Sequence, residues 1–149
     1  MVSRWIVLVA VFVAACGSGS VHEGEYNTRL VRLPDGYEVR CEVMADPQDM
    51  ARGMMFRDSL AENRGMLFLH GEPGKYAYWM YQVEIPLDII WMDSSHRILE
   101  MSPNTPPCEE NFADLCPEYG GSTESMVVLE MAAGSIEKHG LRVGQRLDI

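Results

Sequence analysis

The sequence is short of basic side chains, of cysteine and of long apolar runs. Lys and Arg together number 12 against 22 Asp and Glu, which gives a formal net charge of −10. Binding along nucleic-acid phosphates needs clustered cationic side chains, so this composition argues against a nucleic-acid partner. Four Cys are too few for a scaffold held by disulfides alone. The 149 residues, 47% of them hydrophobic, fit one globular domain.

The signature motifs of several enzyme classes are also missing. The chain has no GxSxG nucleophile turn, no HExxH zinc motif, no P-loop and no GxGxxG dinucleotide motif. Of the four His, only His70 is considered for chemistry, and a solvated strand end is the favoured interpretation of it. No pair of carboxylates has a spacing that implies facing across a cleft. We therefore expect no catalytic set, no cofactor and no metal ligands.

The longest apolar run lies at the N-terminus, where Arg4 precedes 11 apolar residues, Trp5 to Ala15. This run is shorter than the roughly 20 residues that a helix needs to cross a bilayer, and its basic start is typical of a secretory signal. The exit Val13-Ala14-Ala15-Cys16 resembles a bacterial lipobox, which implies cleavage before Cys16 and a diacylglycerol on its thiol. The alternative is an ordinary secretory cleavage with Cys16 incidental.

This interpretation divides the chain into a signal peptide (1–15), a lipidated Cys with a flexible tether (16–27) and a β-rich domain (28–149). Without Arg4, residues 16–149 carry 11 basic and 22 acidic side chains, a net charge of −11. A short Gly- and Ser-rich tether holds a domain close to the membrane surface. We expect an exported protein of the cell envelope, anchored to a membrane through Cys16 and facing the periplasm or the exterior.

Alternating apolar residues and turn signals predict short strands along the rest of the chain. Two hairpins are expected, over 28–44 and 87–101. Two short helices are expected, one from Asp46 with Pro47 in its first turn and one over 135–139 with a serine cap. Further strands are expected at 65–69, 76–80 and 126–131, a turn plus a strand at 141–149, and a loop at 103–122. The pattern predicts a mainly β, compact single domain, a barrel or sandwich of about seven or eight short strands with two short helices.

The cysteines of the predicted domain have different expected roles. Cys108 and Cys116 bracket a nine-residue segment, and an oxidising compartment favours a disulfide between them. The alternative is a reactive thiol pair or a metal site. A metal site would need further Cys or His ligands nearby. Cys41 shares the apolar face of a strand and is expected to be a small buried hydrophobe.

Methionine is abundant, with 11 in the chain, and Met50, Met54 and Met55 lie within about one helical turn of one another. Thioethers bind Cu(I), but Met also fills irregular gaps in apolar cores. Core filling is the favoured interpretation, because these residues stand among other apolar side chains.

Three charged residues have apolar neighbours: Arg57, Asp88 and Glu130. A charge in such a place on a strand can simply point outward. The alternative is that Arg57 pairs with Asp88 or Glu130, since partly buried charges must find partners.

A set of ordered segments runs through residues 28–149. These are Arg52-Gly53-Met54-Met55-Phe56-Arg57, Gly65-Met66-Leu67-Phe68, Tyr78-Trp79-Met80, Ile85-Pro86-Leu87-Asp88, Pro106-Pro107-Cys108, Val128-Leu129-Glu130 and Ala133-Gly134. Together they resemble the bacterial and archaeal family known as domain of unknown function 192. The resemblance implies a compact, mostly β domain with short helices and carries over no activity. The family usually has Lys-Asn-Thr where this chain has Tyr81-Gln82-Val83, so a shared site lined by these residues would bind differently here.

The absence of a catalytic set favours a non-catalytic, lipid-anchored binding or accessory module of the envelope, with a protein or a glycan as its ligand. One alternative is a hydrolase or transferase acting on envelope polymers, with Asp88, Glu130 or His70 as acid or base. The other is copper or thiol redox handling through the methionines or Cys41. The candidate ligand-binding residues are Arg57, Tyr78, Trp79, Tyr81, Gln82, Asp88 and Glu130.

Overall fold

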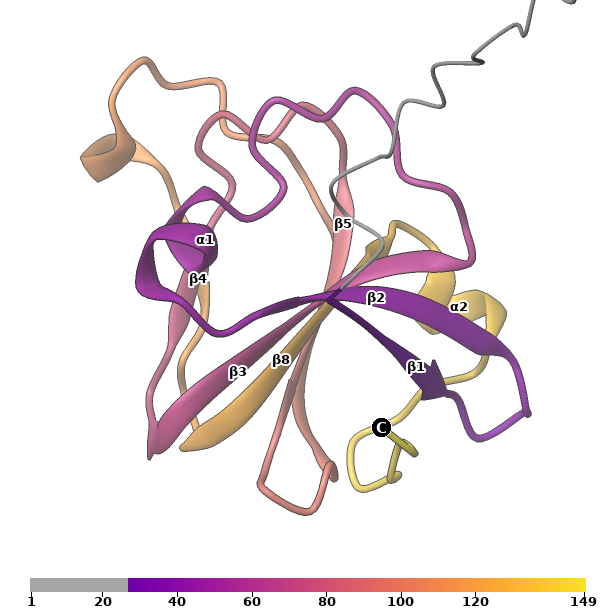
Figure 1. The fold of residues 1–149 in the computed structure, drawn as a ribbon. Coiled ribbons are helices and arrows are strands. Elements are labelled where there is room, and N and C mark those ends of the chain that lie inside the picture. Colours follow the sequence, from indigo (N-terminus) through magenta and orange to yellow (C-terminus); the bar gives the residue numbers. More distant parts are fainter. Residues whose placement is uncertain (1–26) are drawn as a thin grey trace, which may run out of the picture.

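One six-stranded sheet organises the molecule (Figure 1). The computed structural model describes residues 27–149, so the expected signal peptide, Cys16 and nearly all of the tether lie outside the described residues. The strands follow the spatial order β1-β2-β3-β8-β5-β6, and β4 and β7 form a separate two-stranded ribbon. Their bounds are β1 Thr28–Arg32, β2 Glu38–Met44, β3 Arg64–Gly74, β4 Ala77–Trp79, β5 Leu87–Met92, β6 Ile98–Thr105, β7 Glu118–Gly120 and β8 Ser125–Ala132.

All neighbouring pairs in the six-stranded sheet are antiparallel except β2 and β3. The chain passes from β2 to the parallel β3 through the helix α1 (Pro47–Arg52), as a parallel connection requires a crossover. The predicted hairpin over 28–44 is confirmed as β1 and β2, and the one over 87–101 as β5 and β6.

The sheet carries a core on each face, which is why every residue of β5, an interior strand between β8 and β6, is buried. Ile90 and Met92 belong to a core beneath the second helix, α2 (Ser135–Lys138), and the C-terminal segment. Ile89 and Trp91 point to the opposite core, which includes Met54 after α1 and contacts the ribbon. Figure 1 shows α1 and β4 on one side of the sheet and α2 with the C-terminus on the other.

The ribbon of β4 and β7 is held against β5 by Trp91. The indole Nε1 donates a hydrogen bond to the carbonyl oxygen of Tyr76 at 2.8 Å. Gly120 on β7 has a φ of 72°, and a Cβ atom there would lie 2.2 Å from the Trp91 ring. Only glycine both tolerates this conformation and allows the ring to approach so closely.

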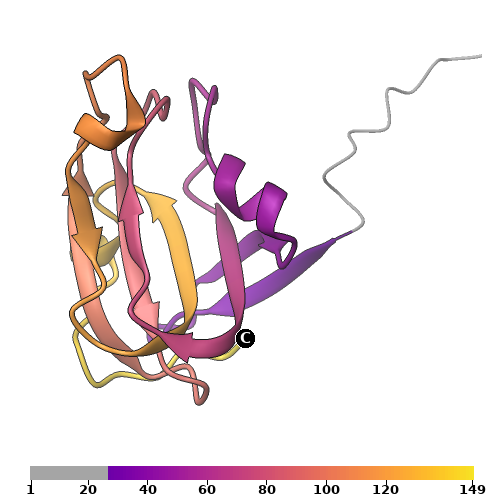
Figure 2. The ribbon, with the colours of Figure 1, turned by 90° about the vertical axis from the view of Figure 1, so that its left-hand side faces the viewer.

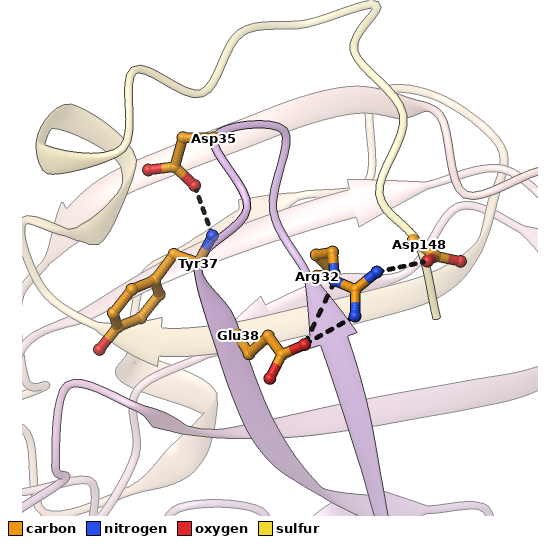
Figure 3. A network of polar contacts seen from close by, with 5 residues as sticks. All are labelled: Arg32, Asp35, Tyr37, Glu38 and Asp148. Carbon is orange, nitrogen blue, oxygen red and sulfur yellow. Dashed lines mark hydrogen bonds and ion pairs between the residues drawn. The ribbon is translucent and has the colours of Figure 1, made fainter.

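The sheet does not close into the barrel that was one of the two predicted architectures; the mainly β single domain is confirmed. No pairing joins β1 to β6 within residues 27–149. The C-terminal segment lies between these two edges instead. Its Arg146 forms an isolated β-bridge with Arg97, next to β6, and its Asp148 forms one with Arg32 at the end of β1. The guanidinium of Arg32 also contacts Glu38 at 2.8 Å and Asp148 at 4.0 Å (Figure 3). The turn predicted in 141–149 forms, but the strand predicted after it is wrong, because this part of the segment makes isolated bridges only.

Both predicted helices form, but one prediction of a cap is wrong. Asp46 caps α1 by accepting the backbone N–H of Gln48, with Pro47 in the first turn as expected. In α2 the N-cap residue is Gly134, with a φ of 87° that favours glycine. Ser135 is the first residue of the helix, and its hydroxyl donates to the carbonyl of Ala132 instead of capping the helix. No helix in the described part of the chain is long and apolar enough to span a membrane.

The segment predicted as loop over 103–122 has more structure than expected. It contains the end of β6, the 3-10 turn Ala113–Leu115 and the strand β7. The predicted disulfide between Cys108 and Cys116 is present.

Candidate functional site

A pocket of about 280 Å³ opens beside the β4–β7 ribbon, between α1 and the sheet. One wall comes from α1 and the turn after it, including Met50, Met54 and Met55. Phe68 and His70 enter from β3, and Tyr78 and Trp79 from β4. This volume lies near the lower limit for small-molecule sites, and a largely apolar lining with a few polar groups is typical of them.

Glu130 on β8 supplies the buried carboxyl group of this pocket. Its register places it between Met66 on β3 and Ile89 on β5, and it is 5% exposed. Its Oε2 atom has no hydrogen-bond partner among residues 27–149. Burial raises the pKa of Glu130 to about 8, with the charge of Arg57 opposing the rise. The group is therefore mostly a neutral carboxylic acid at pH 7.

A stacked aromatic group forms the wall next to Glu130. The ring of His70 stacks on Tyr76 with centroids 3.5 Å apart, and its Nε2 atom lies 3.1 Å from the hydroxyl of Tyr78. The Tyr78 ring meets Phe68 and Trp91 edge to face. Burial lowers the pKa of His70 and raises that of Tyr78, so both side chains are uncharged near neutral pH. This wall is ordered by its own contacts and carries no charge.

Three loops meet at the rim of the pocket. The backbone N–H of Phe56 donates to the carbonyl of Gln82 at 2.9 Å, and that of Cys108 donates to Met80 at 3.1 Å. The hydroxyl of Tyr81 donates to the carbonyl of Asn111 at 3.4 Å. Figure 2 shows these loops at the same end of the molecule, coloured purple, magenta and orange. The disulfide therefore stabilises a loop that contacts the rim.

Arg57 pairs with neither of the carboxylates proposed for it from the sequence. Its two terminal nitrogens donate to the two carboxylate oxygens of Glu42 on β2 at 2.6 and 2.8 Å. The bidentate pair raises the pKa of Arg57 and lowers that of Glu42. It lines a second, more polar hollow on the other side of the turn after α1. Glu130 acts on Arg57 through its charge, without a hydrogen bond.

Asp88 has a structural place away from the pocket. Its side chain is fully buried in β5. One carboxylate oxygen accepts the backbone N–H of Asn104 at 2.7 Å, and the other accepts that of Ile136 at 2.6 Å. Asp88 thus supplies the cap that α2 lacks from its own sequence.

The structure brings together four of the seven candidate ligand-binding residues: Tyr78, Trp79, Tyr81 and Glu130 line the pocket. Gln82 lies at the rim with a φ of 55°, and Arg57 and Asp88 have the partners given above. Tyr81 and Val83, two of the positions where this chain departs from the family pattern, are in the lining.

Sequence reasoning left His70 and the methionines Met50, Met54 and Met55 out of the ligand-binding set, although it named His70 as a possible acid or base. His70 is half-buried in the lining, not a solvated strand end. Met50, Met54 and Met55 line the pocket while also packing on the core, so core filling described only part of their role. The spacing of the methionines in one turn was the available signal for them, and for His70 it was the place at the end of a predicted strand, before Gly71.

Cysteine and metal chemistry find little support in the described region. Cys41 is buried, and burial raises the pKa of its thiol to about 12, which keeps it protonated and unreactive. Within residues 27–149, no group of three or more His, Cys, Asp or Glu side chains is arranged to hold a metal ion.

Comparisons with known proteins agree with this architecture. The family model of domain of unknown function 192, described as "Uncharacterized ACR", matches residues 31–149. A crystal structure from Sinorhizobium meliloti 1021, described as a candidate transcription regulator, has 26% identity and a TM-score of 0.70, covering 80% of this chain and 89% of that one. A protein of unknown function from Novosphingobium aromaticivorans DSM 12444 has 27% identity and a TM-score of 0.71, covering 80% and 82%. No curated protein matches the chain.

Proposed function

The chain belongs to the family of domain of unknown function 192, and from that premise we propose that it is a lipid-anchored, small-ligand-binding module of the cell envelope. The observation that supports binding is Glu130, a pocket-lining residue that is 5% exposed and has one carboxyl oxygen without a partner among the described residues. A buried polar atom without a partner costs free energy unless something outside the fold satisfies it. A ligand that bonds to Glu130 removes that cost.

The family segments noted in the sequence support the same place. Met54, Phe68, Tyr78 and Glu130 each come from a different segment of that set, and all line the pocket. The walls can contact part of a glycan ring or a peptide side chain, because aromatic rings and thioethers pack well against apolar surfaces. The transcription-regulator description of the S. meliloti relative is not carried over, because a net charge of −10 disfavours contact with phosphates.

Ligand binding is tested by a thermal-shift screen of residues 17–149, which keep the whole described domain. The panel contains glycan fragments, peptidoglycan pieces, short peptides, small amines and Cu(I). A ligand at 100 times its Kd stabilises the fold by about 2.7 kcal/mol, or several degrees in Tm. Cu(I) is included because Met50, Met54 and Met55 share the pocket with His70.

The matched variants are Trp79→Ala and Phe112→Ala. Both remove an exposed aromatic side chain, but only Trp79 lines the pocket. A shift that Trp79→Ala abolishes and Phe112→Ala retains supports the proposal. A panel with no shift, or shifts equal in both variants, contradicts binding in this pocket.

Anchoring rests on the Val13-Ala14-Ala15-Cys16 sequence and is tested separately. The full chain is expressed in a bacterium supplied with a labelled fatty acid. The wild type is expected in the membrane fraction carrying label, and Cys16→Ala without label. Label that persists in Cys16→Ala, or its absence from the wild type, overturns the anchor.

A second candidate is a hydrolase or transferase, and one observation favours it: Glu130 is a carboxyl group with a raised pKa inside a pocket that also contains His70. Catalytic acids are often found in such places. Turnover of envelope polymers by the wild type, lost in Glu130→Gln, would support this candidate over simple binding.

A further inference from the structure

We propose that the pocket binds a small organic cation, an ammonium group on a compact apolar body, with the Glu130 carboxylate as its counter-ion. This inference rests on the proposed function and adds the chemical class of the ligand. It follows from three features of the site: an acidic group without a counter-ion among the described residues, the sign of the surrounding charge, and the aromatic and thioether walls.

The first feature is the lack of a cation for Glu130. Arg57 is the basic residue whose charge acts on Glu130, and both its terminal nitrogens bind Glu42 at 2.6 and 2.8 Å. Tyr78 and His70, also in the pocket, are bonded to each other. Within the described residues the Oε2 atom therefore has no donor. A cation brought by a ligand would supply one.

The second feature is the sign of the charge. The whole chain carries a net charge of −10, which attracts cations towards the protein and repels anions. In the pocket lining, Glu118 and Glu130 are acidic, Arg52 is basic and exposed, and His70 is uncharged near neutral pH. The buried charge that the pocket can offer to a ligand, once Glu130 is ionised, is thus negative.

The third feature is the walls. Phe68, Tyr78, Trp79 and Tyr81 line the pocket, and the faces of aromatic rings attract cations and repel anions. The methionine thioethers are polarisable and adapt to an apolar body. A volume of about 280 Å³ limits that body to about one ring with its substituents.

Binding of such a cation is linked to loss of the Glu130 proton. The pKa of this group is raised to about 8 by burial, so below that pH the neutral form predominates and a cation must displace the proton. Arg57 and Tyr78 are the titratable groups that act on it, and the charge of Arg57 favours its ionised form. The other titratable side chains of the lining are His70, Tyr81, Glu118 and Arg52. Affinity for a permanently charged ligand should rise about 100-fold from pH 6 to pH 9 and level off above pH 8.

The test uses benzyltrimethylammonium, which cannot titrate, with benzyl alcohol and benzoate as neutral and anionic controls. Binding to residues 17–149 is measured by calorimetry at pH 6 and 9, and at pH 7 in two buffers of different ionisation enthalpy. We expect benzyltrimethylammonium to bind more tightly than either control at pH 9 and to release close to one proton at pH 7. Tighter binding of benzoate or benzyl alcohol, or a cation affinity that falls with pH, overturns the proposal.

The variants are Glu130→Gln, which keeps the size of the side chain, and Glu137→Gln, which removes an exposed carboxylate on α2, outside the pocket lining. Glu130→Gln should lose at least tenfold in affinity at pH 9 and lose the pH dependence, while Glu137→Gln stays within about threefold. The number of protons released on binding is measured with the wild type alone. A folding defect in Glu130→Gln would therefore leave that test intact.

Failure of this inference is distinct from failure of the proposed function. If uncharged or anionic ligands bind in a way that Trp79→Ala abolishes and the cation does not bind, the pocket is a ligand site of another class. If neither these probes nor the wider screen gives Trp79-dependent binding, both proposals are wrong.

Discussion

The carboxylate of Asp88 accepts the backbone N–H of Ile136 at 2.6 Å and so joins the interior strand β5 to the helix α2, 48 residues later in the chain. Its other oxygen accepts the N–H of Asn104 from β6. A charged residue in the middle of an apolar strand is thus fully used by the fold.

Replacing Asp88 should destabilise the protein without touching the pocket. Asp88→Ala leaves two backbone N–H groups without an acceptor and should lower the free energy of unfolding by about 3 kcal/mol. Asp88→Asn keeps one acceptor oxygen and should cost about half as much. Urea denaturation measures both, with the exposed Asp58→Ala as the control, expected within about 0.5 kcal/mol of the wild type. Equal stability of Asp88→Ala and Asp58→Ala would contradict this role.

The pH dependence of stability should report the burial of Glu130. Its pKa is raised in the folded protein, so its contribution to stability is complete below the pKa of the unfolded chain and is lost as pH rises through about 8. Glu130→Gln does not titrate, so it should match the wild type at pH 4 and exceed its stability at pH 9 by on the order of 2–5 kcal/mol. Denaturation curves at several pH values measure this difference, with Glu118→Gln as the exposed control. Parallel pH profiles for wild type and Glu130→Gln would show that the carboxyl is not buried.

The disulfide should stabilise the rim loop. Cys108 and Cys116 are separated by eight positions, and closing such a loop stabilises the fold by about 2.5 kcal/mol. The Cys108→Ala, Cys116→Ala double variant should lose about that amount and be cut by protease faster within residues 103–117. Reductant should reproduce both effects in the wild type and change nothing in the double variant. Sensitivity of the double variant to reductant would indicate another cause.

Two glycines of positive φ should respond differently to alanine. Gly120 has a φ of 72°, and a Cβ atom added there would lie 2.2 Å from the Trp91 ring, whereas Gly144 has a φ of 92° with open space around it. Gly144→Ala should cost about 1–2 kcal/mol from backbone strain alone. Gly120→Ala should cost about 2 kcal/mol more, because the ring and the ribbon must shift. Equal losses in thermal denaturation would mean that the ribbon does not pack on Trp91.

The local elements of the fold were predictable because their signals lie within a few residues of one another. Alternation gave the two hairpins, and Asp46 with Pro47 gave the start of α1. The cap of α2 was not predictable, since its acceptor, Asp88, comes from a strand 48 positions earlier. The C-terminal segment has the composition of a strand but makes only isolated bridges, because it spans two sheet edges instead of lying along one.

The candidate site was predictable in part for the same reason. Tyr78, Trp79 and Tyr81 share one short stretch of sequence, and the three methionines share one turn, so local spacing already grouped them. Other features depend on the pairing of β2, β3 and β8. These are the ion pair of Arg57 with Glu42, the place of His70 in the pocket, and the Glu130 oxygen without a hydrogen-bond partner in residues 27–149.

The order of the amino acids alone established the acidic charge, the family resemblance, the strand-rich pattern and the disulfide spacing, because each of these depends on residue identity and short-range order. The three-dimensional arrangement was needed to establish which charges are paired, which face of β8 is buried and where a pocket opens. Pairing and desolvation depend on residues far apart in the chain, and burial changes the chemistry of a carboxyl group that is indistinguishable in sequence from any other.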